Sequence, residues 1–233
     1  MKKGADTQAW RSLAARAEET RRVTLRGLFD ADQDRARRFA VSAVGLYADF
    51  SRQRVDRDAL GLLAALADDV DLRGRIDAMW RGDAINVTEN RAVLHTALRV
   101  APGATAGPGG SAIVEEVLAE RARMLRFAAQ VRDGTVRGSS GEPIELVVNI
   151  GIGGSDLGPV MAVNALQPYV RGGPRVAFVS NVDGTDLAEV LQSANAARTL
   201  FIIASKSFVT QETFANASSA RAWLADTLGE AAV

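Results

Sequence analysis

Apolar residues recur at helical spacing through residues 6–80, a stretch dominated by Ala, Arg, Leu, Glu and Asp. Such spacing predicts a succession of amphipathic helices whose apolar stripes form a core. Three stripes carry this prediction: Leu25, Leu28 and Phe29; then Phe39, Val41, Val44 and Tyr47; then Leu60, Leu62, Leu63 and Leu66. We therefore expect the chain to begin with an α-helical region.

A loop rich in glycine and proline follows at residues 101–111. Both residue types interrupt helices and strands, so this loop is the best candidate for a domain boundary. It predicts a helical N-terminal region over residues 1–110 and a second domain over 111–233. The second domain should open with a helix that carries Val114, Val117, Leu118, Leu125 and Ala128 on one side and ends near Asp133 and Gly134.

The pattern then changes to short apolar runs rich in β-branched residues, at 145–150, 175–180 and 199–205. Runs that are apolar on both faces suit parallel strands covered by helices. Helical stretches follow them at 156–166, 186–194 and 211–228, and Asp186 with Glu189 resembles a capping box for the second. This order predicts an α/β fold with a doubly wound, mostly parallel sheet of the flavodoxin-like type.

Composition excludes several classes of function. Lys plus Arg equals Asp plus Glu, at 28 each, which argues against nucleic acid or an acidic membrane as a partner. There is no cysteine, and His95 is the only histidine, so neither thiolate catalysis nor a histidine-rich metal site is available. The N-terminus turns polar directly after Met1 and has no apolar segment of the signal-peptide kind, and no apolar run reaches membrane-spanning length, so we expect a cytoplasmic protein.

The first candidate site is the glycine-rich turn Gly151–Ser155, placed where the first strand meets a helix. Glycines allow a ligand to approach the backbone closely, and a helix start favours an anion. A dinucleotide fingerprint is the nearest alternative, with Asp183 as its acidic residue, but Asp156 stands where its third glycine belongs. A plain strand-to-helix turn is the other alternative.

The second candidate site, Ser205–Thr210, occupies the equivalent place after the third strand. Ser205, Ser207 and Thr210 offer hydroxyl groups and Lys206 offers a positive charge, a donor set that suits a phosphate dianion. Helix capping beside a surface lysine is the structural alternative, although it would use only one hydroxyl. Both loops should meet at the carboxyl edge of the sheet, where open α/β sheets bind ligands.

A third segment, residues 85–99, predicts a helix that begins at Thr88 and turns Val93, Leu94 and Leu98 inward. We interpret His95, within this helix, as a hydrogen-bonded structural residue rather than a catalyst. Arg91 and Arg99 are likewise assigned to structure.

Together these segments resemble the glucose-6-phosphate isomerase family. The similarity is carried by residues 46–54, 86–99, 151–159, 180–186 and 205–213, in the family's order, and extends over roughly residues 40–230. Departures are small: Ser207 stands for the usual Thr, Val209 for a common Thr, and Asn90 for a usual Gly.

The resemblance implies that Gly154 and Ser155 lie against a sugar phosphate and that Ser205, Lys206, Ser207 and Thr210 hold its phosphate. It implies interconversion of glucose 6-phosphate and fructose 6-phosphate in glycolysis and gluconeogenesis, without metal or organic cofactor, by a homodimer.

The resemblance further implies that the domain over 111–233 is a sugar-isomerase (SIS) domain. Family members are about twice as long and carry a second such domain, so the sheet here is expected to be incomplete or to lack that partner. The family's base and ring-opening groups have no counterpart here, and His95 does not match their motif, so we assign no catalytic residue. A regulatory module that binds a sugar phosphate through the same fold is the alternative function.

Overall fold

The computed structural model describes residues 4–233. Residues 1–3, where the polar N-terminal run begins, lie outside the described part. Contacts divide the chain into two compact units, Met1–Leu118 and Ala119–Val233, with the division inside helix α6 (Ser111–Arg132). The domain boundary that the sequence places at residue 110 stays a prediction. None of the helices in residues 4–233 has the length and apolar character needed to cross a bilayer.

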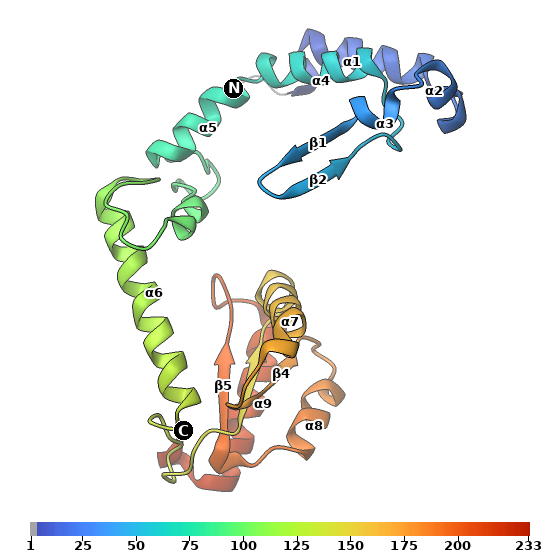
Figure 1. The fold of residues 1–233 in the computed structure, drawn as a ribbon. Coiled ribbons are helices and arrows are strands. Elements are labelled where there is room, and N and C mark those ends of the chain that lie inside the picture. The colour runs from blue at the N-terminus through green and yellow to red at the C-terminus, as the bar shows by residue number, and fades with distance from the viewer. Residues whose placement is uncertain (1–3) are drawn as a thin grey trace. The chain divides into compact units, whose positions relative to one another are not determined.

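The first unit is mainly helical (Figure 1). Its elements are η1 (Gly4–Asp6), α1 (Gln8–Glu19), α2 (Leu25–Ala31), α3 (Arg35–Arg38), β1 (Ala40–Ala43), β2 (Leu46–Asp49), α4 (Arg57–Asp69), α5 (Leu72–Arg81) and η2 (His95–Arg99). Helices α1 and α4 pack against each other. Each longer helix begins at a side-chain cap, as the backbone N–H groups of a first turn require: Thr7, Thr24, Asp56 and Asp71 accept from N–H groups of α1, α2, α4 and α5.

The second apolar stripe is a β-hairpin, and its prediction as a helix was wrong. Strands β1 and β2 are antiparallel and joined by Val44 and Gly45, both at positive φ. That is the backbone of a tight hairpin turn, in which valine is unusual. Tyr47 is exposed and only Phe39 is buried, so these residues do not share one core face.

The prediction of a helix over residues 85–99 was also wrong. Asn86 and Arg91 exchange backbone hydrogen bonds across a short bridge, and Thr88 donates its hydroxyl to the Asn86 side chain instead of capping a helix. Only the short 3₁₀ helix η2 follows. His95 is exposed and so is Leu98, contrary to the expected inward stripe.

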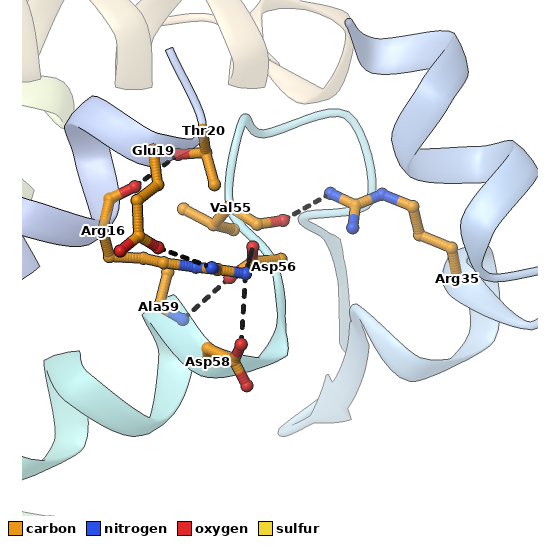
Figure 2. A network of polar contacts seen from close by, with 8 residues as sticks. All are labelled: Arg16, Glu19, Thr20, Arg35, Val55, Asp56, Asp58 and Ala59. Carbon is orange, nitrogen blue, oxygen red and sulfur yellow. Dashed lines mark hydrogen bonds and ion pairs between the residues drawn. The ribbon is translucent and has the colours of Figure 1, made fainter. Parts of the chain in front are cut away.

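An ion-pair network joins α1 to the start of α4 (Figure 2). The Arg16 guanidinium lies 2.9 Å from Glu19, 2.6 Å from Asp56 and 3.1 Å from Asp58. Burial raises the pKa of Asp56, but hydrogen bonds from the Ala59 N–H and from Arg16 outweigh it and hold that pKa below its usual value. The pKa of Arg16 is raised, above all by its hydrogen bond to Asp56. Through its ion pair with Arg16, Asp56, the N-cap residue of α4, is bonded to helix α1.

Arg35 is the largest fully buried side chain of this unit, at 2% exposure. Its guanidinium lies over the Phe39 ring, 4.2 Å from the ring centre. It donates to the main-chain carbonyls of Ser51, Gln53 and Val55. Figure 2 shows the hydrogen bond to Val55. The charge therefore organises the chain that follows the hairpin.

The second unit contains the predicted sheet. Its elements after α6 are β3 (Leu146–Ile150), α7 (Gly154–Leu166), η3 (Gln167–Tyr169), β4 (Arg175–Val179), α8 (Gly184–Gln192), η4 (Ala196–Arg198), β5 (Thr199–Ile203), α9 (Gln211–Leu228) and η5 (Glu230–Ala232). The strands are parallel in the order β4-β3-β5, which confirms the predicted α/β class. The long helix after the loop and its end near Asp133 are confirmed as well.

The helices cover both faces of this sheet, as a doubly wound fold requires (Figure 1). The crossovers β3–α7–β4 and β4–α8–β5 run in opposite directions along the sheet, so the right-handed rule places α7 and α8 on opposite faces. The main core lies on the α8 and α9 face and comprises Leu146, Val148, Ile150, Val179, Leu187 and Ala220. Successive side chains of a strand point to opposite faces, so Val147 and Asn149, which alternate with the core residues of β3, face α7.

Helix α8 is capped by Asp183, so the predicted capping box at Asp186 and Glu189 was wrong. The Asp183 carboxylate accepts from the Thr185 N–H at 2.9 Å. Asp186 instead accepts the backbone N–H groups of Ser180 and Asn181. A carboxylate that accepts two amides orders the β4–α8 loop more firmly than a cap alone.

Candidate functional site

The sheet topology brings the two candidate loops to one edge. β3 and β5 are adjacent and parallel with Ile150 beside Ile203, so the turns that follow them leave at neighbouring positions. The Ala204 N–H donates to the Ile150 carbonyl at 2.8 Å, which continues the pairing beyond the strands. Gly151–Ser155 and Ser205–Thr210 thus begin side by side at the carboxyl edge.

Glycine at position 151 is required by space. A Cβ there would lie 2.9 Å from the Ala204 carbonyl oxygen and 2.9 Å from both Cβ and the carbonyl oxygen of Ser155. Two of these three contacts are main-chain atoms that cannot rotate away. The first turn of α7 is therefore seated directly against the ends of β3 and β5.

The start of α7 offers two unused amides rather than a full set. Gly153, the residue before the helix, has φ 56° and ψ −120°, a conformation suited to glycine. The N–H groups of Ser155 and Asp156 bond within the turn, to Ile152 and Gly153. Those of Gly153 and Gly154 have no acceptor within residues 4–233. Together with the helix dipole they can meet an anion.

In the second loop, the structure brings Ser205 and Thr210 together. Their hydroxyl oxygens lie 3.4 Å apart, and Ser205 also accepts the Phe208 N–H at 3.1 Å. Phe208 has φ 54°, a strained backbone for a bulky residue that tightens the loop. Thr210 precedes α9 but its hydroxyl caps no amide of that helix. The capping alternative therefore does not explain Thr210, and Lys206 and Ser207 are exposed.

Two hollows lie against the sheet, but neither has the character of a phosphate pocket. One, of about 510 Å³, runs between β5 and α9; Ser205 and Thr210 lie in its wall, which is otherwise mainly apolar and includes Phe201 and Phe214. The other, of about 750 Å³, lies against β4 and contains Asp186 and Glu189 but none of the candidate residues. Neither hollow gathers the donors of both loops.

The β4–α8 loop bears on the dinucleotide alternative. A dinucleotide site would need the Asp183 carboxylate to bind a ribose, but this carboxylate caps α8. Hydrogen bonds from Thr185 lower the pKa of Asp183; the bond from the Thr185 backbone N–H has the largest effect, and the bond from its side chain comes second. Asp156 is buried in the first turn of α7, where a pyrophosphate would meet its charge. Among residues 4–233, no cluster of three or more His, Cys, Asp or Glu side chains could hold a metal ion.

Sequence reasoning missed two buried asparagines, one bonded to the glycine-rich turn and the other to the β4–α8 loop. Asn149, in β3, donates its side-chain N–H to the Ser155 carbonyl at 3.0 Å. Asn216, in α9, donates to the Asn181 carbonyl of the β4–α8 loop at 2.7 Å. A polar residue inside an apolar strand was the available signal for the first; nothing in the pattern of α9 marked the second.

Comparison with known proteins gives the family. The sequence model of the family Phosphoglucose isomerase matches residues 49–233. The chain belongs to the phosphoglucose isomerase family. This confirms the resemblance read from the motifs.

Curated relatives agree. The chain is 52% identical over 227 residues to a glucose-6-phosphate isomerase from Deinococcus deserti, covering 97% of this chain and 42% of that one. It is 52% identical over 221 residues to the one from Roseiflexus castenholzii, covering 95% and 41%. The chain thus spans about two fifths of the length of these phosphoglucose isomerases.

A solved structure has the same fold. The crystal structure of a glucose-6-phosphate isomerase from Chlamydia trachomatis matches with a TM-score of 0.76 at 28% identity. The match covers 97% of this chain and 43% of that one. The arrangement of elements described above is therefore that of the corresponding part of a phosphoglucose isomerase.

Proposed function

We propose that this chain supplies the phosphate-binding part of an enzyme that interconverts glucose 6-phosphate and fructose 6-phosphate. One observation carries the proposal: the two donor-rich loops leave adjacent strand ends at the carboxyl edge. The amides of Gly153 and Gly154 and the hydroxyls of Ser155, Ser205, Ser207 and Thr210 supply hydrogen bonds to the phosphate. Lys206 adds a positive charge. A phosphate dianion is held best by several charge-assisted bonds from different directions.

The surroundings of the enzyme follow the family. The substrate is a small sugar phosphate, the place of action is the cytoplasm, and the assembled enzyme is a homodimer that needs no cofactor. Membership of the family and its glycolytic relatives support these statements.

Loss of the Ser205 hydroxyl should weaken binding of fructose 6-phosphate about tenfold or more. A hydrogen bond to a charged group contributes about 1.5–3 kcal/mol, and 1.4 kcal/mol is a factor of ten in affinity. Isothermal titration of the Ser205→Ala variant measures the change. Ser193→Ala is the matched control, since that hydroxyl bonds the Val190 carbonyl at the end of α8, outside the loops. Equal affinities for both variants would place the anion elsewhere.

The 233-residue chain by itself should bind the sugar phosphate but not isomerise it. Isomerisation needs an acid to open the ring, a base to carry a proton between neighbouring carbons, and positive charge beside the enediolate. The family's groups for these steps have no counterpart in this sequence. A coupled assay that reports glucose 6-phosphate formed from fructose 6-phosphate should stay at the background rate, and clear turnover would refute the assignment.

A further inference from the structure

Asn149 is an exception in its strand. β3 is the central strand of the sheet, its sequence is Leu-Val-Val-Asn-Ile, and Asn149 is 8% exposed. A buried amide is costly unless it is hydrogen-bonded. Its Nδ2 donates to the Ser155 carbonyl in the first turn of α7, 3.0 Å away. The bond therefore links the middle of the sheet to the glycine-rich turn.

The Ser155 carbonyl needs this donor because of Pro159. In an α-helix the carbonyl of residue 155 accepts from the N–H of residue 159, and proline has none. Pro159 lies inside α7, and a proline ring also pushes away the carbonyl four residues before it. The Ser155 carbonyl, which lacks the N–H of residue 159 as a donor, is met by the side-chain amide of Asn149 in β3.

Gly151 completes the arrangement. Because residue 151 has no Cβ, Ser155 can lie against the backbone at the end of β3. The first turn of α7 is then fixed by the Asn149 hydrogen bond and by its packing against Gly151. The backbone N–H groups of Gly153 and Gly154 have no acceptor within the described chain.

We propose that Asn149 is a positioning residue for the phosphate site, and that it replaces the helix donor which Pro159 cannot supply. This inference rests on the proposed function for its ligand. Asn149 does not contact the anion; it fixes the orientation of the turn whose amides and Ser155 hydroxyl do. A carbonyl left without a donor would let that turn move, and binding would weaken although every donor to the anion is present.

A cycle of variants tests the coupling. Asn149→Leu removes the donor at similar volume and should raise the dissociation constant for fructose 6-phosphate about tenfold. In a Pro159→Ala background the new N–H of residue 159 can serve the Ser155 carbonyl. Adding Asn149→Leu to that background should then change the dissociation constant by about twofold or less. A tenfold loss in both backgrounds would overturn the proposal, since it would show that Asn149 acts independently of Pro159.

Asn216→Leu is the matched control. Asn216 is 4% exposed and also donates to a loop carbonyl, but it serves the β4–α8 loop. It should leave the dissociation constant within about twofold of the parent. If Asn216→Leu weakens binding as much as Asn149→Leu, the effect is general loosening of the domain and the proposal fails.

A measurement without ligand separates this proposal from the proposed function. Hydrogen exchange of the Ser155, Asp156 and Leu157 amides, which are bonded within the turn, should be about tenfold faster in Asn149→Leu and return to the reference rate with Pro159→Ala. A parent chain that does not bind fructose 6-phosphate would refute the function, while the exchange rates would still decide the role of Asn149. Unchanged exchange in Asn149→Leu would refute that role alone.

Discussion

Replacement of Arg35 by methionine should lower the free energy of unfolding of the first unit by about 3–5 kcal/mol. The side chain is 2% exposed, and its guanidinium donates to the Ser51, Gln53 and Val55 carbonyls at 2.7–2.8 Å. Methionine has an apolar stem of similar length but removes the guanidinium over the Phe39 ring and leaves the three carbonyls without this donor. Each such bond from a charged group is worth more than a neutral one, and partial hydration of the carbonyls limits the total.

The prediction can be checked by urea unfolding, with hydrogen exchange of residues 51–57 to locate the loss. Arg37→Met is the control on the same helix: Arg37 is exposed and pairs with Asp34 at 3.1 Å, a surface ion pair worth about 0–1 kcal/mol. Arg35→Lys should fall between the two, because a lysine keeps the charge but cannot reach three carbonyls with a planar fork. Equal stability of the Arg35→Met and Arg37→Met variants would contradict the assignment.

Gly151→Ala should both destabilise the second unit and remove sugar-phosphate binding. The added methyl would lie 2.9 Å from two main-chain carbonyl oxygens and from Ser155 Cβ, so β3, β5 or the start of α7 must shift. Overpacking of this kind costs about 1–3 kcal/mol. The shift would separate the two loops, and the affinity for fructose 6-phosphate should fall well beyond tenfold.

Gly61→Ala, inside helix α4, provides the control. A Cβ at residue 61 meets nothing within 4 Å, and alanine favours a helix interior by about 0.5–1 kcal/mol over glycine. This variant should therefore be slightly more stable than the parent in urea. Opposite signs for the two alanine variants are the expected result; a Gly151→Ala variant as stable as Gly61→Ala would show that Ser155 does not pack tightly against residue 151.

The sequence was sufficient for the sheet domain because its local signals agree with one another. Runs apolar on both faces, such as residues 199–205, cannot be satisfied as surface strands, so they predict a buried parallel sheet. Glycines and hydroxyl residues directly after two such runs predict where the backbone turns. Parallel strands bring those turns to one edge, and that part of the site followed from the pattern alone.

Where local signals conflicted, the sequence reading failed. The spacing of Val41, Val44 and Tyr47 fits a helix as well as a strand. Val44 occupies the hairpin turn, where a β-branched residue is unexpected because such residues rarely adopt positive φ, so the sequence carried no clear turn signal. In residues 85–99, Thr88 is of a residue type that often caps helices. Here it lies in the turn closed by the backbone bridge between Asn86 and Arg91, and no helix begins there. Short segments of this kind are decided by what they pack against.

The sequence by itself determined the family, the order of strands and helices in the sheet domain, and the two donor-rich loops, because each depends on residues within a few positions of one another. Tertiary structure alone decided that Arg35 serves carbonyls 16–20 residues away. It also decided that the Asn149 side chain reaches the Ser155 carbonyl, that Ser155 packs against Gly151, and that Asp183 rather than Asp186 caps α8. These are matters of which donor reaches which acceptor, and a buried polar group takes whichever partner the folded chain brings within hydrogen-bond distance.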